Sequence, residues 1–135
     1  MVDMNESSSV RHIKILMVED DELNIKMVSS FLKDKYVIEF ARSGDEALKK
    51  SLDHKYDVFL MDIGLKKEMT GLDVTNKLRK IPDYKDTPII ALTAYALTGD
   101  RQRIIEAGCS HYLSKPFTRH QLLLLLENAL NGNNF

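Results

Sequence analysis

Short apolar runs alternate along the chain with longer segments in which apolar residues recur at helical spacing. The apolar runs lie at residues 13–18, 36–40, 57–61, 88–92 and 112–113, and each predicts a strand. The other segments predict helices at residues 22–33, 45–52, 72–80, 98–107 and 118–130. The pattern therefore predicts an α/β protein in which five strands and five helices alternate.

The predicted strands lack the in-and-out alternation of a sheet that has one face in water. The run at residues 57–61, for example, is almost wholly apolar. Strands of this kind are buried on both faces, which is typical of a parallel sheet covered by helices. Ligand sites in such open sheets lie beyond the carboxyl ends of the strands. The candidate functional residues are therefore those at the strand ends: Glu19, Asp20, Asp21, Asp62, Thr93 and Lys115.

The composition is that of a folded protein without a strong charge bias. Hydrophobic residues make up 44% of the 135 positions and charged residues 29%, which excludes a disordered chain. A net charge of −1 gives no reason to expect a nucleic acid or an anionic membrane as a partner. No apolar run approaches the roughly 20 residues of a membrane span. The single cysteine, Cys109, fits a reducing cytoplasm.

The length fits one domain. We expect a flexible tail at residues 1–11, one domain at residues 12–131 and a short tail at residues 132–135. Met17, Met27 and Met61 fall on predicted core positions of that domain.

Acidic residues gather at the ends of the first and third predicted strands. If these strands are neighbours, the carboxylates of Glu19, Asp20 and Asp62 converge. Clustered carboxylates repel one another unless their pKa values rise or a cation joins them. Mg²⁺ prefers carboxylate and water oxygens, so a shared Mg²⁺ site is plausible. The alternative is that these acids cap the following helices, and for Asp21 capping is the favoured interpretation.

Hydrogen-bond donors follow the fourth and fifth predicted strands. Thr93 offers a hydroxyl and Lys115 a positive charge that suits phosphate oxygens. Taken singly, Thr93 could be a turn residue and Lys115 a solvated charge. Two donors facing carboxylates and a metal ion, however, form a phosphoryl-binding arrangement.

Four segments resemble the receiver domains of two-component response regulators. They are ILMVEDDELN at 15–24, DVFLMD at 57–62, PIIALTAYA at 88–96 and EAGCSHYLSKPF at 106–117. The resemblance implies a flavodoxin-like (βα)5 fold with strand order 2-1-3-4-5. It also implies a single-domain response regulator that accepts a phosphoryl group from a sensor histidine kinase or a histidine phosphotransfer protein. The alternative is a receiver domain excised from a hybrid histidine kinase; the start at Met1 and the end just after the last predicted helix favour a stand-alone protein.

The resemblance also implies a role for each matching residue. Asp62 would be the phosphoacceptor, and Mg²⁺ would be held by Asp62, Asp20, the Gly64 carbonyl and, mostly through water, Glu19. Such a chain catalyses its own phosphorylation and dephosphorylation and is not a turnover enzyme.

Further roles concern the response to phosphorylation. Thr93 and Lys115 would contact the phosphoryl group, and Tyr112 would be the aromatic residue that changes rotamer with Thr93. A downstream protein would then read the face formed by the fourth helix, fifth strand and fifth helix. The Lys115–Pro116 bond would be cis.

One segment departs from the family pattern. Gly71 stands nine positions after Asp62 where the family has eight, and Lys66 replaces the usual proline. The loop after the third strand is therefore one residue longer and less rigid, which leaves its effect on site access and kinase docking open.

Two other protein classes share parts of this pattern. Haloacid-dehalogenase enzymes also phosphorylate an aspartate at a strand end, but they need a second aspartate where this chain has Gly64. Flavodoxin-type proteins need a phosphate cradle after the first strand, where the acids at residues 19–22 would repel phosphate.

The last predicted helix is apolar on more than its core face. Leu124 lies almost opposite that face when residues are counted at about 100° each. The core face itself comprises Leu122, Leu126, Ala129 and Leu130. We expect Leu124 to contact another protein, either a second copy in a homodimer or a kinase; the alternative is a tolerated exposed leucine.

Overall fold

The computed structural model describes residues 12–65, 67–94 and 99–132. Within them, five parallel strands form one sheet in the order β2-β1-β3-β4-β5. This confirms the predicted α/β class, flavodoxin-like topology and strand order. The strands are β1 (Lys14–Val18), β2 (Val37–Ala41), β3 (Val58–Asp62), β4 (Ile89–Thr93) and β5 (His111–Ser114).

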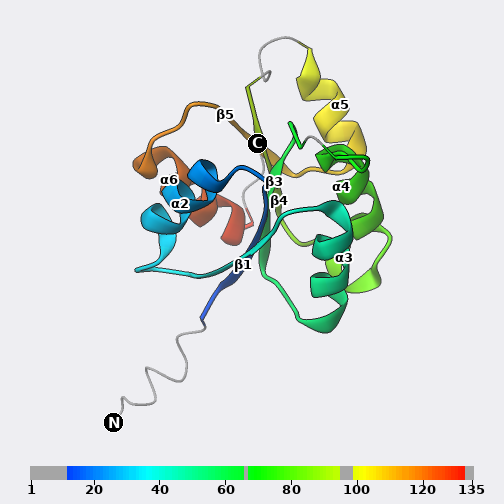
Figure 1. Cartoon of the computed structure of the whole chain (residues 1–135), viewed down its shortest axis with the longest axis horizontal. Helices are drawn as coiled ribbons and strands as arrows, with labels where there is room; N and C mark the ends of the chain where they lie inside the picture. The colour runs from blue at the N-terminus through cyan, green and yellow to red at the C-terminus, as the bar shows by residue number, and fades with distance from the viewer. Residues whose placement is uncertain (1–11, 66, 95–98, 133–135) are drawn as a thin grey trace.

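Helices cover both faces of the sheet. Figure 1 shows α2 and α6 on one side of the strands and α3, α4 and α5 on the other. The chain thus forms three layers, which explains why β3 is buried at every position. The helices are α2 (Glu22–Leu32), α3 (Gly44–Asp53), α4 (Gly71–Arg79), the short 3₁₀ helix η1 (Pro82–Tyr84), α5 (Asp100–Ala107) and α6 (Arg119–Leu130).

Polar side chains mark where most of these helices begin. Asp21, Ser43, Thr70 and Thr118 each accept a hydrogen bond from the backbone N–H three residues further along. Each such cap satisfies an N–H group that has no partner inside the helix. The capping role predicted for Asp21 is therefore confirmed.

Each face of the sheet has its own apolar core. Leu16, Phe59 and Leu78 belong to the core beneath α3, α4 and α5. Met17, Leu60 and Leu122 belong to the core beneath α2 and α6. These two cores fix the strands from both sides and thereby fix the positions of the residues at the strand ends.

Most predicted elements appear within a residue or two of their expected positions. β2 begins and ends one residue later than expected, at Val37 and Ala41. The described part of the fourth major helix begins at Asp100, and the expected start at residue 98 lies outside the described residues. The expected tail at residues 1–11 lies outside them, and so does the expected tail at residues 132–135 except for its first residue.

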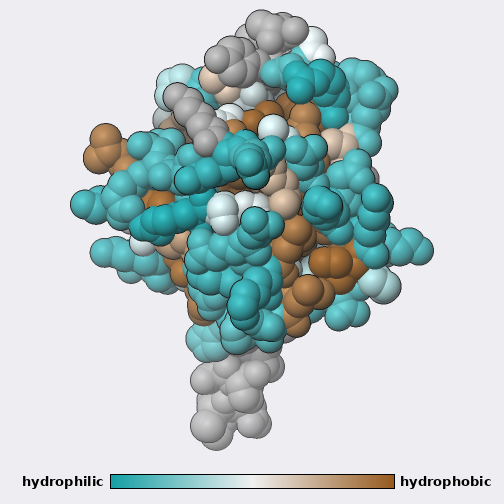
Figure 2. All heavy atoms as spheres, turned by 45° about the vertical axis from the view of Figure 1, so that its right-hand side comes forward, coloured by the Kyte–Doolittle hydropathy of each residue, from teal (hydrophilic) through white to brown (hydrophobic). Residues whose placement is uncertain are grey.

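The surface is mostly polar, with isolated apolar side chains. Figure 2 shows one face as largely hydrophilic with separate hydrophobic patches. Met27 was expected in the core, but its exposed fraction is 36%. Leu124 lies on the outer side of α6 with 48% of its surface exposed, as the helix geometry predicted. Among the described residues, no helix is both long enough and apolar enough to span a membrane.

Candidate phosphoryl and metal site

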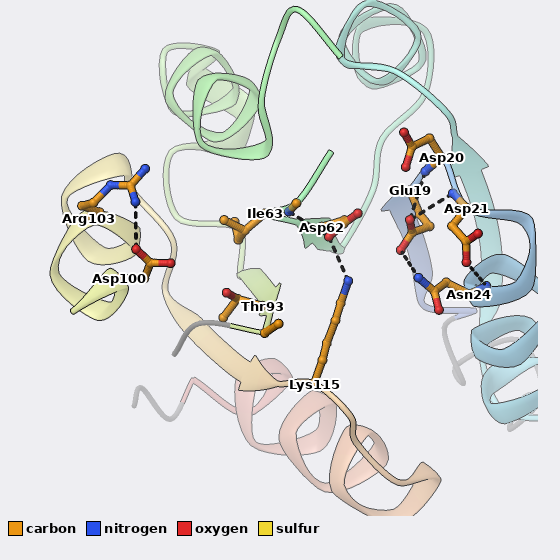
Figure 3. Close-up of a pocket in the computed structure, with 12 residues that line it drawn as sticks. Glu19, Asp20, Asp21, Asn24, Asp62, Ile63, Thr93, Asp100, Arg103 and Lys115 are labelled. Carbon is orange, nitrogen blue, oxygen red and sulfur yellow. Dashed lines mark hydrogen bonds and ion pairs between the residues drawn. The ribbon is translucent and has the colours of Figure 1, made fainter. Parts of the chain in front are cut away.

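The carboxyl ends of the strands surround one polar cleft of about 640 Å³. Figure 3 shows side chains from the ends of β1, β3 and β4 and from the segment after β5 turned toward it. The cleft lies where a parallel sheet of this type binds ligands. Its lining includes every strand-end residue that the sequence singled out: Glu19, Asp20, Asp21, Asp62, Thr93 and Lys115.

Three carboxylates meet on one side of this cleft. An oxygen from each of Glu19, Asp20 and Asp62 lies within 4.8 Å of an oxygen from the others. Glu19 and Asp62 are buried, with exposed fractions of 1% and 4%. Buried like charges at this separation repel strongly, and a hard cation relieves that repulsion. The convergence expected from the sequence is confirmed, and the oxygen-only donor set fits Mg²⁺.

Glu19 is held by the first turn of α2. One oxygen, Oε2, accepts the backbone N–H groups of Asp20 and Asp21, each at 3.1 Å. The other, Oε1, accepts from the Asn24 side-chain amide at 3.3 Å. Burial raises the pKa of Glu19 to about 7, and the nearby Asp62 carboxylate contributes to the rise, whereas the Asp21 N–H and the Lys115 charge act against it. Glu19 therefore takes up a proton more readily than an ordinary glutamate, and a cation bound by this cluster would compete with that proton.

Asp62 ends the fully buried strand β3. Its Oδ1 accepts from the Gly64 backbone N–H at 2.9 Å and from Lys115 Nζ at 2.9 Å. These two donors fix the orientation of the carboxylate. The Lys115 side chain reaches Asp62 from the segment that follows β5 (Figure 3).

The other predicted residues lie on β4 and β5. Thr93 ends β4, is 2% exposed and lines the cleft. Tyr112 lies on β5, is half-buried against the apolar core, and has the Arg101 guanidinium over its ring at 5.5 Å. The Lys115–Pro116 bond is cis, as expected. Tyr112 and Leu124 are not part of the cleft lining.

The segment after β3 comes back to the end of that strand where α4 begins. At Gly71, the first residue of α4, an added Cβ would collide with the Asp62 carbonyl oxygen. Met69 packs against Gly44 at the start of α3, where an added Cβ would meet its sulfur. Gly71 therefore lies directly against the backbone of Asp62, and α4 begins at the end of β3. Lys66 itself lies outside the described residues.

Three polar lining residues were not predicted from the sequence: Asn24, Asp100 and Arg103. Asp100 and Arg103 form an ion pair at 2.8 Å on α5, at the far side of the cleft (Figure 3). Asn24 follows the helix cap Asp21 by three residues, a spacing that places it on the first turn of α2. That spacing was visible in the sequence and could have indicated a contact with the acids before the helix.

Comparisons with known proteins agree with this geometry. The response regulator receiver domain family matches residues 15–127. The polar-differentiation response regulator DivK of Brucella ovis is 41% identical over 117 residues, covering 86% of this chain and 94% of that protein. The chemotaxis response regulator CheY4 of Vibrio cholerae superposes with a TM-score of 0.83 at 33% identity, covering 88% of this chain and 99% of CheY4.

A third relative comes from a sensor kinase. The receiver domain of the sensor histidine kinase PA1611 from Pseudomonas aeruginosa superposes with a TM-score of 0.82 at 34% identity, covering 90% of this chain and 99% of that domain. That structure holds a magnesium ion coordinated in its active-site cleft. With the family match over residues 15–127 and this cleft at the strand ends, the chain belongs to the response regulator receiver domain family.

Proposed function

We propose that this chain is a single-domain response regulator that accepts a phosphoryl group on Asp62 in the presence of Mg²⁺. The observation that carries the proposal is the surroundings of Asp62. Its buried carboxylate ends β3, is held by Lys115, and faces Glu19 and Asp20 in one open cleft. A nucleophile, a positive charge and a metal-binding cluster are the components that phosphoryl transfer requires.

The residues present fit a magnesium ion. Carboxylate oxygens from Asp20 and Asp62, with the Gly64 carbonyl, would hold it directly, and Glu19 would act mostly through water. When bound, Mg²⁺ supplies positive charge that stabilises the transferring phosphoryl group. The chain's own acids determine where that charge is placed.

Transfer would proceed by in-line displacement at phosphorus. A sensor histidine kinase or a histidine phosphotransfer protein presents a phosphohistidine at the mouth of the cleft. An Asp62 carboxylate oxygen bonds to phosphorus while the phosphorus–nitrogen bond breaks and its electron pair leaves with the imidazole. Lys115 compensates the added charge. Attack by water on the acyl phosphate later releases inorganic phosphate, so the chain is a self-dephosphorylating acceptor and not a turnover enzyme.

Phosphorylation of Asp62 would then change the conformation of a protein-binding surface. Thr93 and Lys115 lie at the ends of adjacent strands, and both can donate to phosphoryl oxygens. Movement of Thr93 toward the phosphoryl group would draw Tyr112 with it and change the face formed by α5, β5 and α6. A downstream protein that binds the changed face more tightly would increase the population of molecules in that conformation.

The proposal also covers whether the chain acts alone or within a larger kinase, and where it is located. Relatives include stand-alone regulators and a receiver domain of a sensor kinase, so both the single-domain interpretation and the hybrid-kinase alternative have precedents. The free Cys109 thiol is buried, which is compatible with the proposed cytoplasmic location.

Intact-mass spectrometry tests the proposal. Incubation with Mg²⁺ and a small acyl phosphate should add the mass of one phosphoryl group, and excess chelator should prevent the addition. Asp62→Asn should stay unmodified, and Asp20→Ala should lose both metal binding and phosphorylation. Full modification of Asp62→Asn would refute Asp62 as acceptor, and full modification under chelator would refute the role of the metal.

A further inference from the structure

Asn24 occupies a fixed position on the wall of the acidic cleft. Its backbone N–H donates to the cap residue Asp21 at 3.1 Å, which ties it to the first turn of α2. Its side chain is half-buried and lines both the acidic cleft and an adjoining apolar hollow of about 390 Å³. Figure 3 shows the side-chain amide directed at the Glu19 carboxylate.

The hydrogen bonds of Glu19 differ between its two oxygens. Each carboxylate oxygen has roughly two acceptor positions. Both positions of Oε2 are taken by the N–H groups of Asp20 and Asp21. Among the described residues, Asn24 donates to Oε1, which has a second acceptor position beside that donor. The Asp62 carboxyl group also lies close enough to interact with the Glu19 side chain. Oε1 is therefore the Glu19 oxygen that can serve a cation or its water, and Asn24 is the residue that aims it.

We infer that Asn24 is a positioning residue of the cation site, acting through Oε1 of Glu19. The inference rests on the proposed function, because it assigns a residue to the same metal site. An amide suits this position for a specific reason. It donates to the carboxylate without adding a charge, whereas aspartate would add another carboxylate to the cluster and leucine would fill the space without donating.

Removal of a residue that hydrogen-bonds a metal ligand typically lowers the affinity for the metal ion about 10- to 100-fold. We expect the low end, about tenfold, since Oε2 of Glu19 keeps its two backbone donors after the substitution. Asn24→Ala and the space-filling Asn24→Leu should both show this loss. Ser29→Ala, on the same helix and likewise half-buried, is the matched control and should bind Mg²⁺ like the unmodified chain.

The experiment is a Mg²⁺ titration of the full chain followed by amide NMR shifts, which needs no phosphorylation. It includes a double-mutant cycle in which Asn24→Ala is also measured in a Glu19→Ala background. If Asn24 acts through Glu19, its substitution changes affinity by less than about twofold in that background. Thermal melting confirms that each variant is folded before its affinity is compared.

The outcomes separate the two proposals. If the unmodified chain does not bind Mg²⁺, the proposed function fails and the role of Asn24 fails with it. If the chain binds Mg²⁺ and both Asn24 variants bind equally well, only the role of Asn24 is overturned. An equal loss with and without Glu19 would likewise overturn it, because Asn24 would then act by another route.

Discussion

Acidification should weaken Mg²⁺ binding, because the ion needs Glu19 as a carboxylate and a proton competes for the same group. Burial, together with the nearby Asp62 carboxylate, raises the pKa of Glu19 to about 7. When one proton competes with the ion, the apparent dissociation constant for Mg²⁺ equals the intrinsic constant multiplied by the factor 1 + 10^(pKa − pH). A change from about pH 8 to about pH 6 should therefore weaken Mg²⁺ binding roughly tenfold.

Amide NMR titrations with Mg²⁺ at both pH values measure this change. Glu19→Gln is the control, because it keeps the shape of the side chain but cannot take up the proton. Its affinity should be lower than that of the unmodified chain at the higher pH and should depend much less on pH. Equal dissociation constants for the unmodified chain at both pH values, or the same tenfold change in Glu19→Gln, would refute the reasoning.

Protonation of Glu19 weakens Mg²⁺ binding, but in the metal-free chain it should stabilise the folded state. Without Mg²⁺, the pKa of Glu19 is about 7 in the folded chain against the ordinary 4.5, so the folded state binds the proton more tightly than the unfolded state. The free energy of unfolding should therefore fall as pH rises from about 4.5 to about 7. Urea unfolding should show this fall in the metal-free chain, and Glu19→Gln should reduce it.

Further substitutions test three other parts of the molecule: the switch, the outer face of α6 and the loop after β3. Thr93→Ala and Lys115→Ala should shrink the amide shifts that phosphorylation causes in α5 and β5, and unchanged shifts would remove these residues from the switch. Leu124→Glu should leave folding and phosphorylation intact but weaken association in light scattering or pull-down experiments, since 48% of Leu124 is exposed; unaltered association would make it ordinary surface. Gly71→Ala should lower the free energy of unfolding by about 1–3 kcal/mol and slow phosphorylation, because its Cβ crowds the Asp62 carbonyl. Gly44→Ala, which crowds the Met69 and Val74 side chains and not the Asp62 carbonyl, should lower stability without slowing phosphorylation, and an equal slowing in both variants would contradict this explanation.

The strand ends could be predicted because burial on both faces leaves a strong sequence signal. β3 is buried at every position and stops at Asp62, the residue that enters the cleft. The same holds for β4, which stops at Thr93. A polar residue after a wholly apolar run is easily located, and parallel topology then brings such residues together.

The faces of α2 were harder to predict, because this helix carries two apolar stripes. Ile25, Val28 and Leu32 are buried, and they cluster within about 60° of one another around the helix. Leu23 and Met27 lie on a different side and are 75% and 36% exposed. Helical spacing alone does not distinguish a stripe that packs on the sheet from one that faces outward.

Asn24 and Arg79 were missed for a different reason. The spacing of Asn24 after Asp21 indicates its place on the first turn of α2, but its contact with Glu19 also depends on which way the Glu19 side chain turns after β1, and periodicity carries no such information. Arg79 lies at the end of α4 and donates to the carbonyls of Gly108, Tyr84 and Thr87 at 2.6–2.7 Å. Those partners follow it by up to 29 positions, so the contacts exist only once the fold has formed.

The most direct test of the central claim locates the phosphoryl group on the chain. Borohydride reduction converts a phosphorylated aspartate to homoserine, which peptide mass spectrometry identifies by position. After incubation with Mg²⁺ and a small acyl phosphate, homoserine should appear at Asp62, and omission of Mg²⁺ should abolish it. Homoserine at Asp20 or Asp21 instead of Asp62, or an equal yield at Asp62 without Mg²⁺, would contradict the account.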